Sequence, residues 1–129
     1  MDNYLDNNKS IHLVLNDIKL EHEIKHFLRD YASDIRSSKH INKFLNEPLS
    51  QAPACLITSL NLSETDGMSL IKRMQSNGLS IPVIVIATED DSVYSAVKAL
   101  QAGAADFIQQ PIEKRDFISR LNRVVKSSK

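Results

Sequence analysis

Polar residues that could bind or react gather in four short clusters, each directly after an apolar stretch: Asn16-Asp17, residues 59–66, residues 87–89 and residues 109–111. Ser59 offers a hydroxyl, which is a weak nucleophile unless a base activates it, and these clusters contain no His or Lys. Asn16, Ser59 and Gln110 are neutral and can hydrogen-bond to one another without a cation. No P-loop, nucleophile elbow or dinucleotide fingerprint is present. We therefore expect a polar pocket with no enzymatic activity and no cofactor.

The elements that must position these clusters are short apolar runs that alternate with stretches of helical periodicity. The predicted strands cover residues 11–15, 33–37, 54–58, 81–87 and 105–109. The run 81–87 is apolar on both faces, as in a central strand of a parallel sheet that helices cover on both sides. Such alternation implies right-handed crossovers, so the sequence predicts an α/β fold with a three-layer, doubly wound, five-stranded parallel sheet. The polar clusters would then meet at the carboxyl edge of this sheet.

Residues at the predicted helix ends carry their own expectations. Pro48 is expected to stop the second helix. Asp66 is expected to cap the third helix, with Gly67 giving the turn its freedom. Ser92 or Asp91 is expected to cap the fourth helix. The apolar stripe that predicts this fourth helix consists of Val93, Ala96, Val97 and Leu100.

Length and composition indicate one ordinary globular domain of 129 residues. Sixteen basic residues balance sixteen acidic ones, so nothing in the charge suggests a membrane surface or nucleic acid as the main partner. The only cysteine, Cys55, is expected to be a small buried hydrophobe, and a reducing cytoplasm fits. We expect a flexible tail over residues 1–10 and a domain over residues 11–126.

Histidines and basic residues elsewhere offer weaker candidates. His22 and His26 are four residues apart on the first helix and could share a metal, but they lie opposite its apolar stripe and lack a third ligand. His12 is expected to cap or edge the first strand. The last helix is rich in cations: Lys114, Arg115, Arg120, Arg123, Lys126 and Lys129. Because Glu113 and Asp116 accompany them without interleaved aromatic residues, a solvated face is expected rather than contact with nucleic acid.

Several segments resemble, in their order and spacing, the receiver domains of bacterial response regulators, over roughly residues 11–125. The segments are residues 65–70, residues 81–86, residues 99–108 and Pro111. Within the CheY-like superfamily, they look nearest to the FixJ-type branch of nitrogen-fixation regulators. The resemblance implies a flavodoxin-like fold with the strand order 2-1-3-4-5.

The resemblance also implies a phosphorylation pocket, from which this sequence departs. In the family, two acids after the first strand help to hold magnesium, and an aspartate ending the third strand accepts the phosphoryl group. A lysine before the proline after the fifth strand contacts the phosphate. Here Asn16 stands in the first acidic place, Asp17 keeps the second, Ser59 stands at the phosphoacceptor position and Gln110 replaces the lysine. Asp17 is thus the only remnant metal ligand, and magnesium should bind poorly.

A further position of the implied pocket is left open between two residues. The family places a Thr or Ser after the fourth strand to contact the phosphate. This chain has one extra residue between Pro82 and Gly103, so either Ala87 or Thr88 occupies the place.

The face formed by the fourth helix, fifth strand and fifth helix is the interaction surface that the resemblance implies. Candidate residues there are Tyr94, Lys98, Gln101, Phe107 and Gln109. Phe107 stands where the family carries an aromatic residue that swings between exposed and buried positions; alternatively, it packs on the fourth helix. A protein partner or a second copy of the chain would dock on this face.

The resulting hypothesis is an atypical receiver domain of bacterial signal transduction that works by protein–protein contact without phosphorylation. It could be the regulatory part of a transcriptional regulator. One alternative is a receiver that is phosphorylated by unusual means. The other is a pseudo-receiver whose neutral pocket binds a small ligand.

Overall fold

A five-stranded parallel sheet forms the centre of the computed structural model, which describes residues 10–46, 52–62 and 65–127. The strands are β1 Ser10–Val14, β2 Asp34–Ser38, β3 Cys55–Ser59, β4 Val83–Ala87 and β5 Asp106–Gln109. Their order across the sheet is β2-β1-β3-β4-β5, and every neighbouring pair is parallel. The predicted α/β fold and strand order are therefore confirmed.

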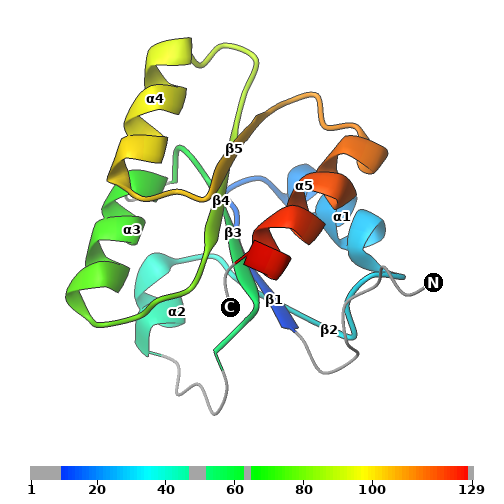
Figure 1. The fold of residues 1–129 in the computed structure, drawn as a ribbon, viewed down its shortest axis with the longest axis horizontal. Coiled ribbons are helices and arrows are strands. Elements are labelled where there is room, and N and C mark those ends of the chain that lie inside the picture. The colour runs from blue at the N-terminus through cyan, green and yellow to red at the C-terminus, as the bar shows by residue number, and fades with distance from the viewer. Residues whose placement is uncertain (1–9, 47–51, 63–64, 128–129) are drawn as a thin grey trace.

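Helices cover both faces of the sheet, as Figure 1 shows. They are α1 Ile18–Leu28, α2 Ile41–Asn46, α3 Gly67–Ser76, α4 Val93–Ala102 and α5 Lys114–Ser127. The α1 and α5 helices lie on one face, and α2, α3 and α4 lie on the other (Figure 1). Each helical crossover returns the chain to the end of the sheet where the strands begin, so all five parallel strands finish together at the opposite end.

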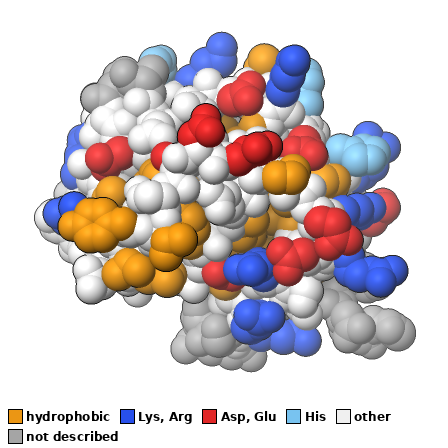
Figure 2. Space-filling model, turned by 90° about the horizontal axis from the view of Figure 1, so that it is seen from above, with side chains coloured by type: hydrophobic (Ala, Val, Ile, Leu, Met, Phe, Trp, Pro, Cys, Tyr) orange, Lys and Arg blue, Asp and Glu red, His pale blue; other side chains and the backbone are white. Residues whose placement is uncertain are grey.

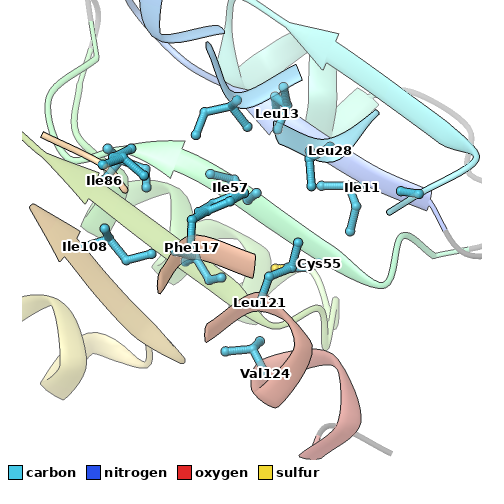
Figure 3. Close-up of a cluster of buried hydrophobic side chains, with 14 of the residues drawn as sticks. Ile11, Leu13, Leu28, Cys55, Ile57, Ile86, Ile108, Phe117, Leu121 and Val124 are labelled. Atoms are coloured by element: carbon cyan, nitrogen blue, oxygen red, sulfur yellow. The ribbon is translucent and has the colours of Figure 1, made fainter. Parts of the chain in front are cut away.

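The sheet separates two hydrophobic cores, and β4 contributes to both because successive side chains of a strand point to opposite faces. Ile84 and Ile86 pack toward α1 and α5, whereas Val83 and Val85 pack toward α3. Figure 3 shows the first core, in which Phe117 of α5 lies among side chains of the central strands. Cys55 belongs to the same core, as predicted, and burial raises the pKa of its thiol to about 12.

Two expectations about the start of the chain need adjustment. Residues 1–9, most of the predicted tail, lie outside the described residues, but Ser10 is the first residue of β1. His12 does not cap or edge a strand. It lies buried within β1, 2.9 Å from the Ser38 hydroxyl and edge-on to the Phe44 ring. The prediction failed because β1 begins at Ser10, so that His12 is the central residue of the strand and not a residue at its end.

The helix ends follow the predicted capping with two refinements. Asp66 caps α3 by accepting a hydrogen bond from the Ser69 N–H at 2.8 Å. Ser92, rather than Asp91, caps α4 by accepting from the Ser95 N–H. Pro48 lies outside the described residues. Gly67 was expected to give the turn its freedom, but that prediction is wrong, because Gly67 has no positive φ and the described positive-φ glycines are Gly78 and Gly103.

The reason for Gly67 is a close approach between backbones. A Cβ atom added there would lie 2.9 Å from the Ser59 carbonyl oxygen and 3.3 Å from Cγ2 of Thr58. The first contact is shorter than side chains tolerate, and the atom it meets belongs to the rigid β3 backbone. A larger residue would therefore push α3 away from the end of β3, where the polar clusters meet.

We predict that Gly67→Ala lowers the free energy of unfolding by about 1–3 kcal/mol, because overpacking against β3 outweighs the better helix propensity of alanine. Urea denaturation would measure the loss. The matched control is Ser76→Ala, which adds alanine at the exposed last residue of α3 and should leave stability nearly unchanged. A Gly67→Ala protein that is more stable than the wild type would contradict the packing argument.

Candidate functional site

A polar hollow of about 460 Å³ lies at the carboxyl ends of β1, β3 and β4. It is lined by Asn16, Asp17, Ile18, Leu20, Ser59, Asn61, Ile86, Thr88, Asp91 and Gln110. The structure thus brings together five of the six residues that the sequence placed in the pocket. Ala87 is the exception, since it is buried in the core on the α3 side. Thr88 therefore faces the hollow.

The floor of the hollow is a neutral pair formed by Asn16 after β1 and Ser59 at the end of β3. The Ser59 hydroxyl donates to Oδ1 of Asn16 at 3.1 Å, and the Asn16 backbone N–H donates to Oγ of Ser59 at 3.3 Å. The Asn16 side-chain amide also donates to the Asn61 carbonyl. Ser59 is only 4% exposed, so these bonds satisfy a polar group that water hardly reaches.

Two carboxylates border the hollow, and each already has a structural role. Asp17 caps α1 by accepting from the Lys19 N–H at 3.0 Å. Asp91 accepts from both the backbone N–H and the hydroxyl of Thr88, at 2.8 and 3.1 Å. Sequence reasoning missed Asp91 as a lining residue because an acidic run before a helix normally indicates only capping.

This donor set does not fit the magnesium ion of the family pocket. Magnesium requires near-octahedral oxygen coordination, usually from one or two carboxylates together with phosphate. Here one oxygen of Asp17 and both oxygens of Asp91 already accept hydrogen bonds, and the described residues contain no cluster of three or more His, Cys, Asp or Glu suited to a metal. His22 and His26 are both exposed on α1, as expected.

Gln110 stands at the mouth of the hollow with its side chain uncommitted. Its backbone N–H donates to the Ala87 carbonyl at 2.8 Å and continues the pairing of β4 and β5. Within the described part of the chain, its side-chain amide has no hydrogen-bond partner. This amide can donate and accept, but it brings no positive charge to the hollow.

Some residues of the predicted interaction face are exposed to solvent, whereas others pack or hydrogen-bond within the chain. Tyr94 is 68% exposed, with the Lys98 ammonium 5.2 Å from its ring centre, and Gln101 is also exposed. Phe107 is partly buried against the core on the α3 side, so the packed alternative describes it in this structure. The Gln109 amide is bonded within the chain to backbone carbonyls after β4.

An apolar stripe on α4 faces outward. Val93, Val97 and Leu100 are 82%, 45% and 48% exposed, and the only buried residue of α4 is Ala99. Figure 2 shows hydrophobic side chains gathered toward one edge of this end of the molecule, beside acidic ones. Periodicity predicted the helix correctly but not the direction of its stripe, because small residues (Ala96, Ala99 and Ala102) make the inner contact.

On α5, Arg120 forms ion pairs with two carboxylates. Arg120 lies 2.9 Å from Asp106 and 3.0 Å from Asp116. Burial works to lower the pKa of the Arg120 guanidinium, but the two carboxylates outweigh it and raise that pKa. Among the described residues, none of the helices combines the length and apolar character needed to cross a membrane.

Comparison with known proteins identifies the family. The response regulator receiver domain matches residues 11–122, so the chain belongs to this family of two-component signalling domains. The virulence transcriptional regulatory protein PhoP of Shigella flexneri is 32% identical over 110 residues, covering 83% of this chain and 48% of PhoP. The response regulator protein TmoT of Ectopseudomonas mendocina is 26% identical over 121 residues, covering 94% of this chain and 54% of TmoT.

Solved structures of receiver domains have the same fold as this chain. The crystal structure of FixJ-N matches with a TM-score of 0.83 and 24% identity, covering 95% of this chain and 97% of that one. The chain spans about half the length of the curated relatives it matches.

We predict that Ser59→Ala lowers the free energy of unfolding by about 1–2 kcal/mol, because it removes the partner of two Asn16 groups at a poorly hydrated site. Chemical denaturation would measure this. The matched control, Ser80→Ala, changes an exposed serine that makes no side-chain hydrogen bond in the described structure, and it should be neutral. Equal stability of Ser59→Ala and the wild type would show that the neutral pair contributes nothing.

Proposed function

We propose that this chain is an atypical receiver domain that works as a protein–protein interaction module without phosphorylation. The observation that carries this proposal is the state of Ser59. It ends β3, where the family resemblance implies the phosphoacceptor aspartate, and its hydroxyl donates to the Asn16 amide oxygen. A receiver whose nucleophile position holds a bonded serine has lost the acceptor chemistry that the family uses.

The surroundings of Ser59 support the same conclusion. A serine becomes a useful nucleophile when a base takes its proton, but the Asn16 amide oxygen is not a base of that kind. Among the described residues, the hollow is lined by two carboxylates and by no cationic side chain, so a phosphoryl group there would meet uncompensated negative charge. Gln110 offers only a neutral amide in place of the lysine.

We further propose that the exposed α4 stripe is the docking surface and that its first occupant is a second copy of the chain. Val93, Val97 and Leu100 form a continuous apolar line that water covers in the single chain. The chain carries equal numbers of acidic and basic residues, so two copies do not repel each other through net charge. A regulatory role beside a transcriptional effector, in the cytoplasm, fits the relatives.

A small polar ligand is a second candidate for the hollow. The supporting observation is the Gln110 amide, which lines a cavity of about 460 Å³ without a partner in the described structure. A ligand that binds the folded state raises its thermal stability by an amount that grows with the logarithm of the ligand concentration relative to Kd. A thermal-shift screen of metabolites would therefore reveal such a ligand, whereas a screen without any shift would remove this candidate.

We predict that magnesium with beryllofluoride leaves the NMR spectrum of the wild-type protein unchanged, and that acetyl phosphate adds no mass. The reason is that Ser59 replaces the acceptor carboxylate, the pocket does not suit magnesium, and Gln110 replaces the lysine that would contact the phosphate. The control is the triple variant Asn16→Asp, Ser59→Asp and Gln110→Lys, which restores the implied family pocket and should show magnesium-dependent shifts. A mass gain of one phosphoryl group on the wild type would instead support phosphorylation by unusual means.

We also predict that the wild type self-associates and that Val97→Glu weakens this association at least about tenfold, because a charge buried in an apolar interface loses its hydration. Sedimentation over a range of concentrations would measure the change. Ile18→Glu is the matched control, since it places the same charge at a 60% exposed apolar residue outside α4. A wild type that stays monomeric at high concentration would contradict the choice of a second copy as the occupant.

A further inference from the structure

The side-chain amide of Gln109, the last residue of β5, points at the loop of residues 88–92 that joins β4 to α4. Its nitrogen lies 2.8 Å from the Asp91 carbonyl oxygen, 3.0 Å from that of Thr88 and 3.3 Å from that of Glu89. An amide nitrogen carries two hydrogens, so the two shorter contacts can both be full hydrogen bonds. One side chain thus contacts three of the backbone carbonyl oxygens of this loop.

The loop is also tied from within. The Asp91 carboxylate accepts from the Thr88 backbone N–H and from its hydroxyl, and the Thr88 hydroxyl accepts from the Asp90 N–H at 3.2 Å. The Thr88 hydroxyl is therefore engaged as both donor and acceptor. It could turn toward a ligand in the hollow only by giving up these bonds.

The two sets of bonds fix the start of α4. Asp91, which takes part in both, is followed directly by Ser92, the N-cap of α4, and by Val93, the most exposed residue of the apolar stripe. Holding the Asp91 carbonyl holds the first turn of the helix at a set distance from β5. The position of the α4 stripe thus depends on a side chain of the neighbouring strand.

We infer that Gln109 is a positioning residue that clamps the loop 88–92 and sets the place of the α4 docking surface without any signal from the hollow. This inference deepens the proposed function and rests on it: an interaction module without a phosphorylation trigger needs another means of holding its docking helix. Gln109 meets this need because its donors are neutral, permanent and independent of what occupies the hollow. It acts through the loop, and it was expected from the sequence to contact a partner instead.

Amide hydrogen exchange followed by NMR tests the clamp. Gln109→Met keeps the length of the side chain and removes its donors, so the amides of Thr88, Asp90 and Asp91 should exchange about tenfold faster, as expected when a loop loses two hydrogen bonds. Amides of β1 and α1 should be unaffected. The matched control, Gln101→Met, makes the same replacement at an exposed glutamine of α4 and should leave the loop amides at their wild-type rates.

A rescue variant separates the donor role from simple packing. Gln109→Lys carries an ammonium with three donors, one for each carbonyl, and should restore the slow exchange of the loop amides. Wild-type exchange rates in Gln109→Met, or equally fast exchange in Gln109→Lys and Gln109→Met, would overturn the inference.

The same samples distinguish a failure of the clamp from a failure of the proposed function. Magnesium and beryllofluoride should change the spectrum of neither the wild type nor Gln109→Met. A response in the wild type would overturn the proposed function and, with it, the role given to the clamp in place of a trigger. Slow exchange in Gln109→Met without any beryllofluoride response would overturn the clamp alone.

Discussion

The hydrogen bonds between Asn16 and Ser59 are the interaction on which the rest of the site depends. They join the ends of two neighbouring parallel strands, where the sheet topology forces polar side chains together. Carboxylates gathered at such a point repel one another unless a cation offsets their charge. An amide and a hydroxyl have no such need. The site is consequently held by the chain itself, and the residues around it are free to serve as caps and loop ties.

The carboxylates and amides around this neutral floor show the consequence. Asp91, which borders the hollow, is bonded to Thr88, and Gln109, at the end of β5, is bonded to the loop 88–92, so both residues stabilise the connection to α4. The loop 88–92 thus connects the hollow to α4. Its residues Thr88 and Asp91 line the hollow, and the loop leads directly into Val93, the first residue of α4. Yet the bonds in this loop join groups of the chain to each other. The hydrogen-bonding groups of this loop are thus already satisfied within the chain.

The fold was predictable from the sequence because its signal is repeated along the chain. The run 81–87 is apolar on both faces, and the alternation of runs and stripes leaves few other topologies. The convergence of Asn16, Ser59 and Gln110 was predictable for the same reason, since parallel strands end at one edge. The choice between Ala87 and Thr88 was not, because a shift of one residue turns a side chain from the hollow to the core. The roles of Asp91 and Gln109 depend on loop carbonyls, whose directions no sequence pattern specifies.

The direction of the α4 stripe carries the strongest argument for interaction, because the fold does not require it. Both cores are filled by other elements, and α4 contributes one fully buried residue, Ala99. Val93 is 82% exposed and Val97 and Leu100 are 45% and 48% exposed, so each leaves apolar surface in water. Polar residues at these positions would preserve the helix equally well. An apolar line that stays largely exposed, on a helix whose start is tied in place, is the kind of surface that another protein can cover.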